Sequence, residues 1–530
     1  PFTPIDANIS DGVQFKAVDH VVTRPLFDHI NDKYKLLSCN GESCSESEVI
    51  DGAESFVETI NYIKADNVNT QFTTLNFGSS IDISADGKTM AIGDAGNFID
   101  IDLNIFNGTV AIFTNTNGSW AQQMRFVANG IEIDEGFGAT VSLSADGNTL
   151  AVSAIADKSN HIGVTNGTSA PSLRDTTGEH AGAVYVFTRT NNIWTRQAYI
   201  KPDRRASHYR FGTSLNISAD GNTLAIGTTI SFYNGSPNLA YVYTRDINTW
   251  SQNAVLSGGS NTDIGDVFGA QVSISGDGLT LAVSAIGEDS QGIGIDNENI
   301  ADIAPPSQTD NTATSSGAIY IFTRDTLPTI DTWSQQAYIK ASNTENADSL
   351  GTAITLSNDG NTLAVAALGE DSNDRNNEID NTSLNSGAVY IYTRNNSIWS
   401  QQDYLKADNI HANAGFGSAL DLSDNGNTLA IGARKEKSSA IGYSGDQIDS
   451  EFESGAAYLF IRDTNNKWNQ KAYLKASNPD IGDAFGDSIS LSGDASILAV
   501  GAPNEQSSSL GINNDQLNND DGNKGAVYVY

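Results

Sequence analysis

Residues 137–153 read FGATVSLSADGNTLAVS, and this stretch decides the fold of the chain. Apolar and polar residues alternate on both sides of Asp146-Gly147, which predicts two β-strands joined by a tight turn. An Asx-Gly pair supplies the positive φ angle that such a turn needs. Downstream, GAVYVFT at 182–188 and WTRQAYIK at 194–201 are rich in β-branched and aromatic residues. Residues 137–201 therefore predict one four-stranded antiparallel unit.

The same pattern recurs seven times along the chain. Its first strand opens with Phe-Gly, or once with Leu-Gly, at Phe77, Phe137, Phe211, Phe268, Leu350, Phe416 and Phe485. All six Trp occupy one slot, the start of the fourth strand: Trp120, Trp194, Trp250, Trp333, Trp399 and Trp468. Six copies have Asp-Gly or Asn-Gly at the first turn. The seventh has Asp494-Ala495, which predicts a turn of another type.

The seventh copy ends at Tyr530, after its third strand, and the missing fourth strand is matched by residues 55–67, SFVETINYIKADN. Seven four-stranded units with a borrowed last strand predict an all-β, seven-bladed propeller, because closure removes the exposed edges of the first and last units. Residues 1–54 do not match the repeat and are predicted to be a separate extension or clasp. The predicted blades are 77–128, 137–201, 211–256, 268–341, 350–407, 416–476, and 485–530 together with 55–65.

The Phe-Gly and Gly-Ala elements of these units resemble FG-GAP repeats, the units of the integrin α-subunit head and of many bacterial surface proteins. The resemblance covers residues 55–530 and rests on seven motifs in register. It implies a secreted or surface-displayed protein that binds a glycan or another protein. Integrin-type repeats often carry a D-x-D-x-D-G-x-x-D calcium loop in the first hairpin. Here that hairpin reads S-A-D-G-N-T-L with one Asp, so calcium is not expected there.

Composition excludes several other classes of protein. The chain has 29 basic and 64 acidic residues and a formal charge of -35, which would repel nucleic acid and anionic membrane surfaces. No run of 18 apolar residues occurs, so no membrane insertion is expected. The chain begins at Pro1 without an apolar leader, so a signal peptide is expected to have been removed or left out. The protein is expected to be a monomer or part of a larger polypeptide. The two cysteines, Cys39 and Cys44, would form a disulfide only in an oxidising compartment.

The loops between the second and third strands differ most in length between units, and they are much longer in units 2 and 4 than in unit 3. Long, variable loops are where binding residues concentrate. In a four-stranded meander these loops emerge on the same face as the connections between blades. We therefore expect recognition on this face.

Pairs of carboxylates recur on the same face. One acid lies two residues before the Phe of the first strand, and a second acid follows the end of the second strand, 22 residues later. Because the start of the first strand lies beside the end of the second, each pair is predicted to be close in space. The pairs are Glu135 with Asp157, Asp266 with Glu288, Asp348 with Glu370, and Asp483 with Glu505. Unit 6 has Glu436 opposite Ala414.

Three roles fit these carboxylates. They could accept hydrogen bonds from loop amides and hold the root of the loop. They could bind a hard cation, Ca²⁺ above all, together with loop oxygens. They could also act as the acid and base of glycoside hydrolysis, although four similar copies argue against a catalytic role.

Basic residues are scarce but cluster at the connection into unit 3, which reads KPDRRASHYR at 201–210. The long loop of unit 2 adds further basic and histidine side chains, and the two segments are predicted to adjoin. An anion such as an acidic glycan would fit this patch, whereas pairing with nearby acids or a zinc site of His161, His180 and His208 are the alternatives. The patch comprises His161, Arg174, His180, Arg204, Arg205, His208 and Arg210.

The sequence therefore favours a ligand-recognition or adhesion module that binds an acidic glycan or a surface protein. Two alternatives stay open. One is a polysaccharide-degrading hydrolase or lyase with its site at the mouth of the central channel. The other is a structural spacer within a larger adhesin.

Overall fold

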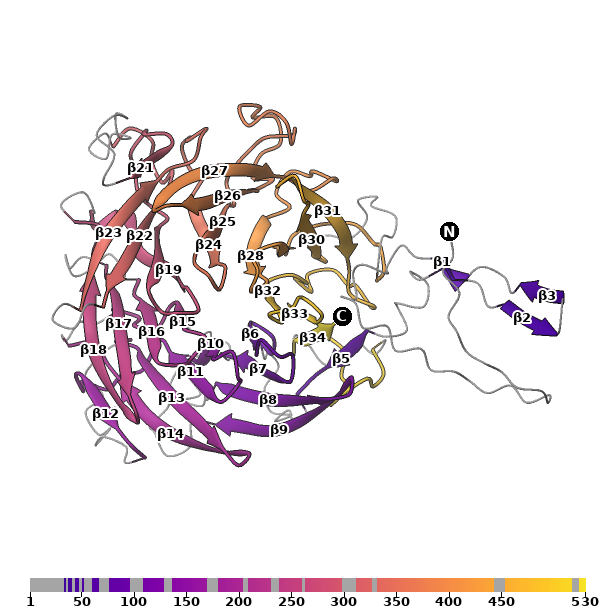
Figure 1. Cartoon of the computed structure of the whole chain (residues 1–530), viewed down its shortest axis with the longest axis horizontal. Helices are drawn as coiled ribbons and strands as arrows, with labels where there is room; N and C mark the ends of the chain where they lie inside the picture. The colour runs from indigo at the N-terminus through magenta and orange to yellow at the C-terminus, as the bar shows by residue number, and fades with distance from the viewer. Residues whose placement is uncertain are drawn as a thin grey trace.

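The structure is a computed structural model of the chain. It describes the backbone of four short strands before residue 52, and then residues 60–65, 76–95, 108–127, 136–168, 180–203, 208–229, 238–259, 263–297, 311–326, 331–442, 453–516 and 524–530. Seven antiparallel sheets surround a central axis and form a β-propeller, as the sequence predicted (Figure 1). In each blade the strands A to D run from the axis outward, in chain order.

The first four blades are formed by the following strands. Blade 1 contains β6 (Ser80–Ile83), β7 (Thr89–Asp94), β8 (Thr109–Thr116) and β9 (Ser119–Val127), and blade 2 contains β10 (Phe137–Leu143), β11 (Thr149–Ala154), β13 (Ala183–Thr190), β14 (Ile193–Ile200) and β12 (Val164–Asn166). Blade 3 contains β15 (Leu215–Ile217), β16 (Thr223–Gly227), β17 (Ala240–Asp246) and β18 (Thr249–Leu256). Blade 4 contains β19 (Phe268–Ile274), β20 (Thr280–Ala285), β22 (Ala318–Asp325), β23 (Thr332–Ile339) and β21 (Ile295–Asn297), and a 3₁₀ turn (Ile264–Asp266) precedes it.

The last three blades complete the ring. Blade 5 contains β24 (Leu350–Leu356), β25 (Thr362–Ala367), β26 (Ala388–Asn395) and β27 (Ile398–Leu405), and blade 6 contains β28 (Phe416–Leu422), β29 (Thr428–Ala433), β30 (Ala456–Arg462) and β31 (Trp468–Leu474). Blade 7 contains β32 (Ser488–Leu491), β33 (Leu498–Ala502), β34 (Ala526–Val529) and, as its outer strand, β5 (Asn61–Ile63). The β5 strand pairs antiparallel with β34, with Tyr62 opposite Tyr528. The two ends of the propeller therefore meet within one sheet.

A ring of seven backbone hydrogen bonds surrounds the central channel. It lies at the turns between strands A and B, where an amide of each blade donates to a carbonyl of the next blade. Each bond is 2.8 to 3.2 Å long, and the last one, from Gly493 N–H to Ala85 O, connects blade 7 to blade 1. The members of the ring are Ala85, Ala145, Ala219, Gly276, Asn358, Asp424 and Gly493.

The glycines that define the repeat lie where adjacent blades touch. Gly182 precedes strand C of blade 2, has a φ of +78°, and packs against the Phe211 backbone of blade 3. A Cβ atom on Gly182 would lie 2.3 Å from Phe211 O, so only glycine fits. The same approach recurs between Gly455 and Phe485, and between Gly525 and Phe77 across the closing junction. The Phe-Gly and Gly-Ala elements are therefore the two sides of one contact between blades.

The long loops of blades 2 and 4 each add a fifth strand, which the sequence did not predict. The β12 strand pairs with β14, and β21 pairs with β23. At the end of each added strand an Asn side chain bonds the backbone of a Trp in the next blade. Asn166 accepts from Trp250 N–H at 2.8 Å and donates to Trp250 O at 3.0 Å, and Asn297 bonds Trp399 in the same way. These loops therefore fasten neighbouring blades together.

The prediction of a different turn in the seventh copy is wrong. Ala495 adopts a φ of 57°, and its N–H donates to Ser492 O at 2.8 Å, the same bond that Gly147 makes to Ser144. The Ser492 hydroxyl bonds the Asp494 carboxylate, as Ser144 bonds Asp146 in blade 2. The Ser-x-Asp hydrogen bonds hold the turn, and Ala495 takes on the left-handed backbone that glycine adopts elsewhere.

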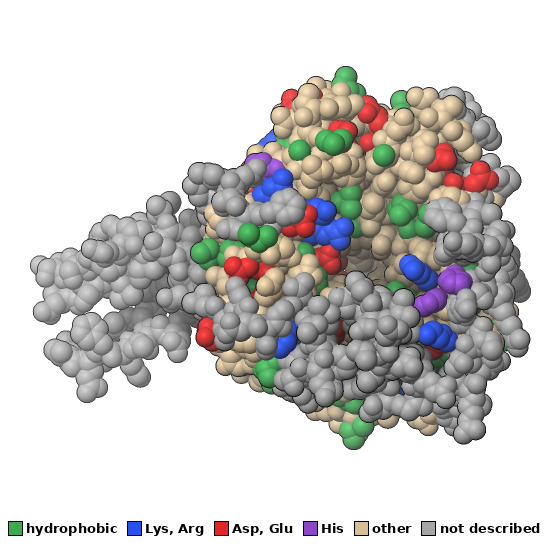
Figure 2. Space-filling view, turned by 180° about the vertical axis from the view of Figure 1, so that it is seen from behind, with side chains coloured by type: hydrophobic (Ala, Val, Ile, Leu, Met, Phe, Trp, Pro, Cys, Tyr) green, Lys and Arg blue, Asp and Glu red, His purple; other side chains and the backbone are tan. Residues whose placement is uncertain are grey.

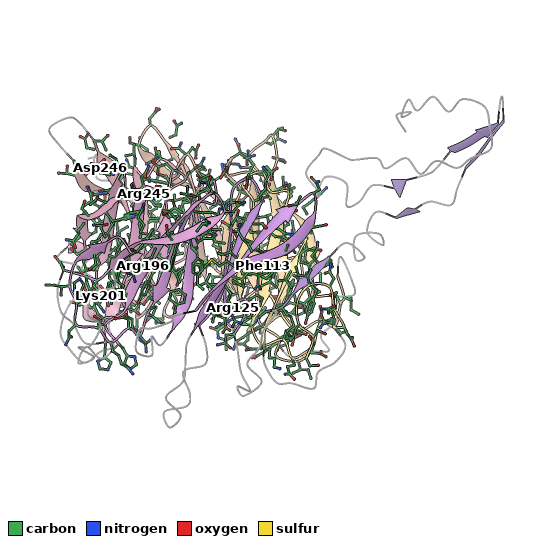
Figure 3. All side chains as sticks on the ribbon, turned by 90° about the horizontal axis from the view of Figure 1, so that it is seen from below. Phe113, Arg125, Arg196, Lys201, Arg245 and Asp246 are labelled. Atoms are coloured by element: carbon green, nitrogen blue, oxygen red, sulfur yellow. The ribbon has the colours of Figure 1, made fainter. Side chains whose placement is uncertain are left out.

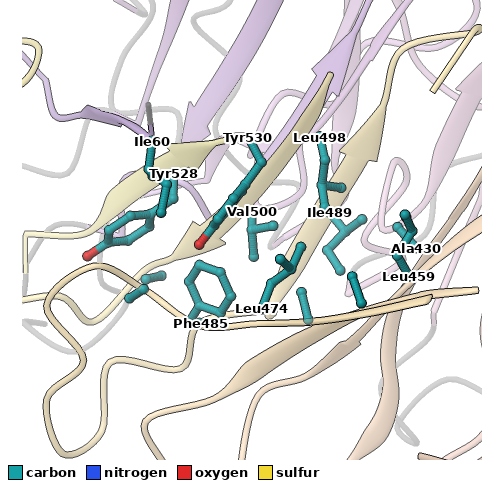
Figure 4. Packing of buried hydrophobic residues seen from close by; sticks show 14 of the residues in the cluster. Ile60, Ala430, Leu459, Leu474, Phe485, Ile489, Leu498, Val500, Tyr528 and Tyr530 are labelled. Atoms are coloured by element: carbon teal, nitrogen blue, oxygen red, sulfur yellow. The ribbon is translucent and has the colours of Figure 1, made fainter. Parts of the chain in front are cut away.

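The hydrophobic core lies between adjacent blades. Figure 4 shows one cluster, in which Leu459 and Leu474 of blade 6 share a core with Ile489, Val500 and Tyr528 of blade 7. Five of the six Trp side chains are buried at these junctions and Trp333 is partly buried, as their recurrence on strands predicted. Trp250, for example, is 1% exposed and donates its Nε1–H to Gln197 of the preceding blade at 2.8 Å.

The chain before the propeller contains two short hairpins. The β1 strand (Lys33–Tyr34) pairs with β4 (Ile50–Asp51), and β2 (Leu37–Asn40) pairs with β3 (Ser43–Glu46). The register of β2 and β3 places Cys39 directly opposite Cys44.

Candidate functional site at the loop roots

The two faces of the propeller carry different groups of residues. Figure 3 shows the disc edge-on, with Asp246 of a C–D turn at one face and Lys201, at the end of strand D of blade 2, near the other. The B–C loops and the connections between blades form the second face, which we call the B–C face. The described members of the predicted carboxylate pairs and of the predicted basic patch lie there.

A buried ion pair holds the root of the B–C loop in five blades. The acid that follows strand B contacts the ammonium of a lysine that follows strand D of the same blade. Lys340 Nζ lies 2.6 Å from Glu288 Oε2 in blade 4, and the two side chains are 0% and 2% exposed. The other pairs are Asp157–Lys201, Glu370–Lys406, Glu436–Lys475 and Glu505–Lys64, with every side chain at most 2% exposed.

Serine and tyrosine hydroxyls complete the root in blade 4. In blade 4 the Lys340 ammonium also donates to Ser316 Oγ at 2.7 Å, and Ser290 Oγ bonds both Glu288 and the Tyr338 hydroxyl. The Ser316 hydroxyl in turn donates to the Glu288 and Ser290 carbonyl oxygens. Burial lowers the pKa of Lys340, while the adjacent Glu288 carboxylate opposes this shift. A buried charge pair is tolerated only when its remaining donors and acceptors are satisfied, and these hydroxyls satisfy them.

Blades 5 to 7 add an asparagine from the preceding connection. Asn478 Nδ2 donates to Glu505 Oε1 at 3.0 Å, and Asn478 Oδ1 accepts from the Tyr528 hydroxyl at 2.6 Å. Asn343 and Asn409 make the same two contacts in blades 5 and 6. Each loop root therefore joins the beginning and the end of its blade through one carboxylate.

The structure brings the predicted carboxylate pairs together, except for Glu135, which lies outside the described residues. In blade 4 the backbone of the two segments is joined by a 3.0 Å hydrogen bond from Gly287 N–H to Asp266 O. Burial, together with the nearby charges of Glu288, Asp263 and Asp289, raises the pKa of Asp266 to about 7. The pKa of Asp348 and that of Asp483 are also raised to about 7, by burial first and then by Glu370 and Glu505, respectively.

This geometry gives one member of each pair a clear role. The acid after strand B holds the loop root through a lysine, which is a stronger form of the hydrogen-bonding role considered above. Among the described residues no group of three or more His, Cys, Asp or Glu side chains is arranged to hold a metal ion. Calcium binding at these pairs stays a prediction. The aspartates before strand A are the members that keep unbalanced negative charge.

The lysines are the functional residues that sequence reasoning missed, although the sequence contains a signal for them. The five blades that have the acid also have Lys-Ala or Lys-Pro directly after strand D, at Lys64, Lys201, Lys340, Lys406 and Lys475. Blades 1 and 3 lack both, with Val127-Ala128 and Ser257-Gly258 at the corresponding positions. The acid and the lysine are present together in five blades and absent together in the other two. This pattern could have revealed the ion pair.

Part of the predicted basic patch also comes together. The rings of His180 and His208, from blade 2 and from the connection into blade 3, lie 5.6 Å apart between centroids, and Arg210 N–H donates to His180 O at 3.1 Å. Histidine and basic side chains appear side by side on one face in Figure 2. His161 lies apart, bonded to Thr165 and 6.1 Å from the Tyr199 ring. Arg174, Arg204 and Arg205 lie outside the described residues.

The pKa of His161 is lowered, first by burial and second by the charge of Lys201. His161 therefore belongs to the surroundings of the Asp157–Lys201 pair. A zinc site made of His161, His180 and His208 finds no support in this arrangement, because only two of the three rings adjoin.

Comparison with known proteins agrees with the repeat pattern. Residues 333–392 and 468–530 match the family model described as FG-GAP repeat. The chain is thus a seven-bladed propeller that contains FG-GAP repeats, a fold that is generally ligand-binding or adhesive and whose repeats are typical of extracellular proteins. No curated protein sequence matches the chain. Within the described ranges, no helix has the length and hydropathy of a membrane-spanning segment.

Solved structures of similar shape share little sequence with this chain. The WD40 repeats of RRP9 are 10% identical, with a TM-score of 0.46 over 88% of this chain and 98% of that chain. The periplasmic gluconolactonase PpgL of Pseudomonas aeruginosa is 13% identical, with a TM-score of 0.40 over 74% and 87%. Sqt1 of Chaetomium thermophilum is 12% identical, with a TM-score of 0.41 over 83% and 82%.

Proposed function

We propose that the protein is a secreted or surface-displayed recognition module, and that an acidic glycan binds on its B–C face between the blade 2 loop and the connection into blade 3. The observation that carries the proposal is the adjacency of His180 and His208 beside Arg210 on a chain with a formal charge of -35. Arginine forks and protonated imidazoles suit carboxylate or sulfate groups.

The backbone at this place is common to several blades, whereas the side chains differ. His180 and His208 have φ angles of 49° and 62°, and Asn385 and Asn413 repeat them between blades 5 and 6 with 49° and 60°. Ser315 and Ala347 stand at the same two positions between blades 4 and 5, with 52° and 67°. A constant backbone that presents different side chains at each junction is typical of a recognition surface. Only the junction of blades 2 and 3 has two histidines there.

The proposal is tested by the binding of uronic and sulfated oligosaccharides to the wild type and to His180→Ala/His208→Ala. The matched control is Asn385→Ala/Asn413→Ala, which alters the same two backbone positions at another junction. We expect the histidine variant, and Arg204→Ala/Arg205→Ala, to lose affinity while the control retains it. Binding should also weaken as salt is raised, because exposed charges are screened beyond roughly 8–10 Å at physiological ionic strength. Equal affinities for all four proteins, or binding confined to neutral sugars, would reject the site.

Calcium is the second part of the proposal. The charges of Glu288, Asp263 and Asp289 add to the effect of burial in raising the pKa of Asp266, and a hard cation would relieve that repulsion. It would do so without displacing Lys340, because the lysine contacts the other carboxylate of the pair.

A further inference from the structure

The loop roots of blades 5, 6 and 7 contain a lysine, a glutamate, an asparagine and a tyrosine in one arrangement. The glutamate carboxylate lies between two nitrogens. In blade 6, Glu436 Oε2 lies 2.9 Å from Lys475 Nζ, and Glu436 Oε1 lies 3.2 Å from Asn409 Nδ2. In blade 5 the corresponding distances from Glu370 are 2.7 Å to Lys406 Nζ and 3.5 Å to Asn343 Nδ2.

Blade 7 has the same arrangement across the closure of the propeller. Lys64 directly follows β5, which comes from the N-terminal part of the chain. Asn478 lies in the connection before blade 7. Glu505 contacts the ammonium of Lys64 and accepts from Asn478 Nδ2 at 3.0 Å. All three side chains are at most 6% exposed.

We propose that these units form amide cross-links between the lysine and asparagine side chains, joining Lys406 to Asn343, Lys475 to Asn409 and Lys64 to Asn478. The reaction is a transamidation that needs no oxidant and no cofactor. The lysine nitrogen bonds to the asparagine Cγ, the Cγ–Nδ2 bond breaks, and ammonia leaves with the protons released by the lysine.

Each neighbouring group supplies one requirement of this reaction. The carboxylate takes a proton from the ammonium through one oxygen and delivers a proton to the departing Nδ2 through the other. The tyrosine hydroxyl donates to the carbonyl oxygen on which negative charge develops, at 2.5 Å from Tyr390, 2.8 Å from Tyr458 and 2.6 Å from Tyr528. Burial lowers the pKa of Lys64 and of Lys406, which favours the neutral amine that attacks.

The reacting groups of blades 5 and 7 are buried, which disfavours competing hydrolysis, whereas Asn409 of blade 6 is half-buried. The three lysines are at most 2% exposed, and Asn343 and Asn478 are 9% and 6% exposed. The attacking nitrogen must come within about 3–3.5 Å of Cγ. The four rotatable bonds of the lysine side chain allow that approach while the nitrogen stays beside the carboxylate that holds both partners.

Blade 2 provides an internal control. It has the buried pair of Asp157 and Lys201, but Gly130 stands seven residues before Phe137, where Asn343, Asn409 and Asn478 stand before their own blades. The position that holds an asparagine in blades 5 to 7 is thus a glycine in blade 2, so we expect no cross-link there. In blade 4 the residue at that position is Asn261, which lies outside the described residues.

The first test is the intact mass of the purified full-length chain. Each cross-link removes one ammonia, about 17 Da, so we expect a deficit of at least three such units. Glu505→Gln should reduce the deficit by one unit, whereas Asp157→Asn in blade 2 should leave it unchanged. Fragmentation of proteolytic peptides should identify Lys64 joined to Asn478. A wild-type mass equal to that of the sequence would overturn the proposal.

The second test detects the bond that closes the ring. A protease site is inserted directly after Asn67, and the folded protein is cleaved and then denatured without any reduction step. We expect the fragment that contains Lys64 to stay attached to the remainder of the chain. Lys64→Arg keeps the positive charge beside Glu505 but cannot form the amide, so this variant should fold and then separate into two fragments. Separation of the wild type would exclude the Lys64–Asn478 bond.

Discussion

The buried ion pair of blade 4 allows a stability measurement with a control in the same chain. Lys340→Met replaces the ammonium with an apolar group of similar length and leaves Glu288, which is 2% exposed, without its cation. Removing one partner of a buried pair costs roughly 3–5 kcal/mol, because the remaining charge stays buried. The control is Arg375→Met, since Arg375 pairs with Asp408 at the surface, where the two side chains are 49% and 46% exposed. Breaking an exposed pair costs at most about 1 kcal/mol.

Urea unfolding monitored by Trp fluorescence measures both costs, because the Trp side chains lie at blade junctions. Low pH favours neutralisation of the unpaired carboxylate, so the stability penalty of Lys340→Met should be largest at pH 8 and shrink as the pH falls toward 5. Lys340→Met combined with Glu288→Gln removes both charges and should recover much of the loss. The reasoning fails if Lys340→Met costs no more than Arg375→Met, or if its cost does not depend on pH.

Three further predictions concern the buried aspartates, calcium and the added strand of blade 4. Burial raises the pKa of Asp266, of Asp348 and of Asp483 to about 7, above the ordinary 3.8. The stability of the protein should therefore fall as pH rises from about 4.5 to 7 and then level off. The melting temperature of Asp348→Asn should depend less on pH than that of the wild type. Calcium should raise the melting temperature of the wild type, and Asp266→Asn/Glu288→Gln should reduce the increase. If calcium causes no increase and calorimetry detects no bound metal, these carboxylates serve only to hold the loop root. Asn297→Ala removes two hydrogen bonds to Trp399 and should cost roughly 1–3 kcal/mol, with faster hydrogen exchange at the Trp399 amide, whereas Asn381→Ala, which removes one exposed contact to Glu345, should change neither.

The fold could be predicted from the sequence because each feature of the repeat occurs several times along the chain. Six Phe-Gly elements and one Leu-Gly, six Trp in one slot and the strand-like segment near residue 60 leave little choice of architecture. The three-residue strands β12 and β21 were missed because they lie inside long polar loops, where so short a segment carries no periodicity. Their shared ending, V-T-N at 164–166 and I-D-N at 295–297, was the available signal.

The site was only half predicted. The recurrence of acids after strand B pointed to the right side chains, but their lysine partners come from the other edge of each blade, some 36 to 52 residues later in blades 2 and 4 to 6 and at the opposite end of the chain in blade 7. Spacing along the chain does not reveal a contact between the ends of two non-adjacent strands. The adjacency of His180 and His208 was predictable because the topology places a B–C loop beside the next connection, whereas their distance depends on the packing of two blades.

The ring of seven backbone hydrogen bonds has a consequence for how such a chain can be rearranged. The bond from Gly493 to Ala85 is equivalent to the other six, so the junction between blades 7 and 1 is not special within the ring. A circular permutant that joins the native ends and opens the chain at another inter-blade connection would keep all seven bonds. Duplication or loss of a single blade would change the angle between every pair of neighbouring blades, so the seven bonds could not keep their present geometry.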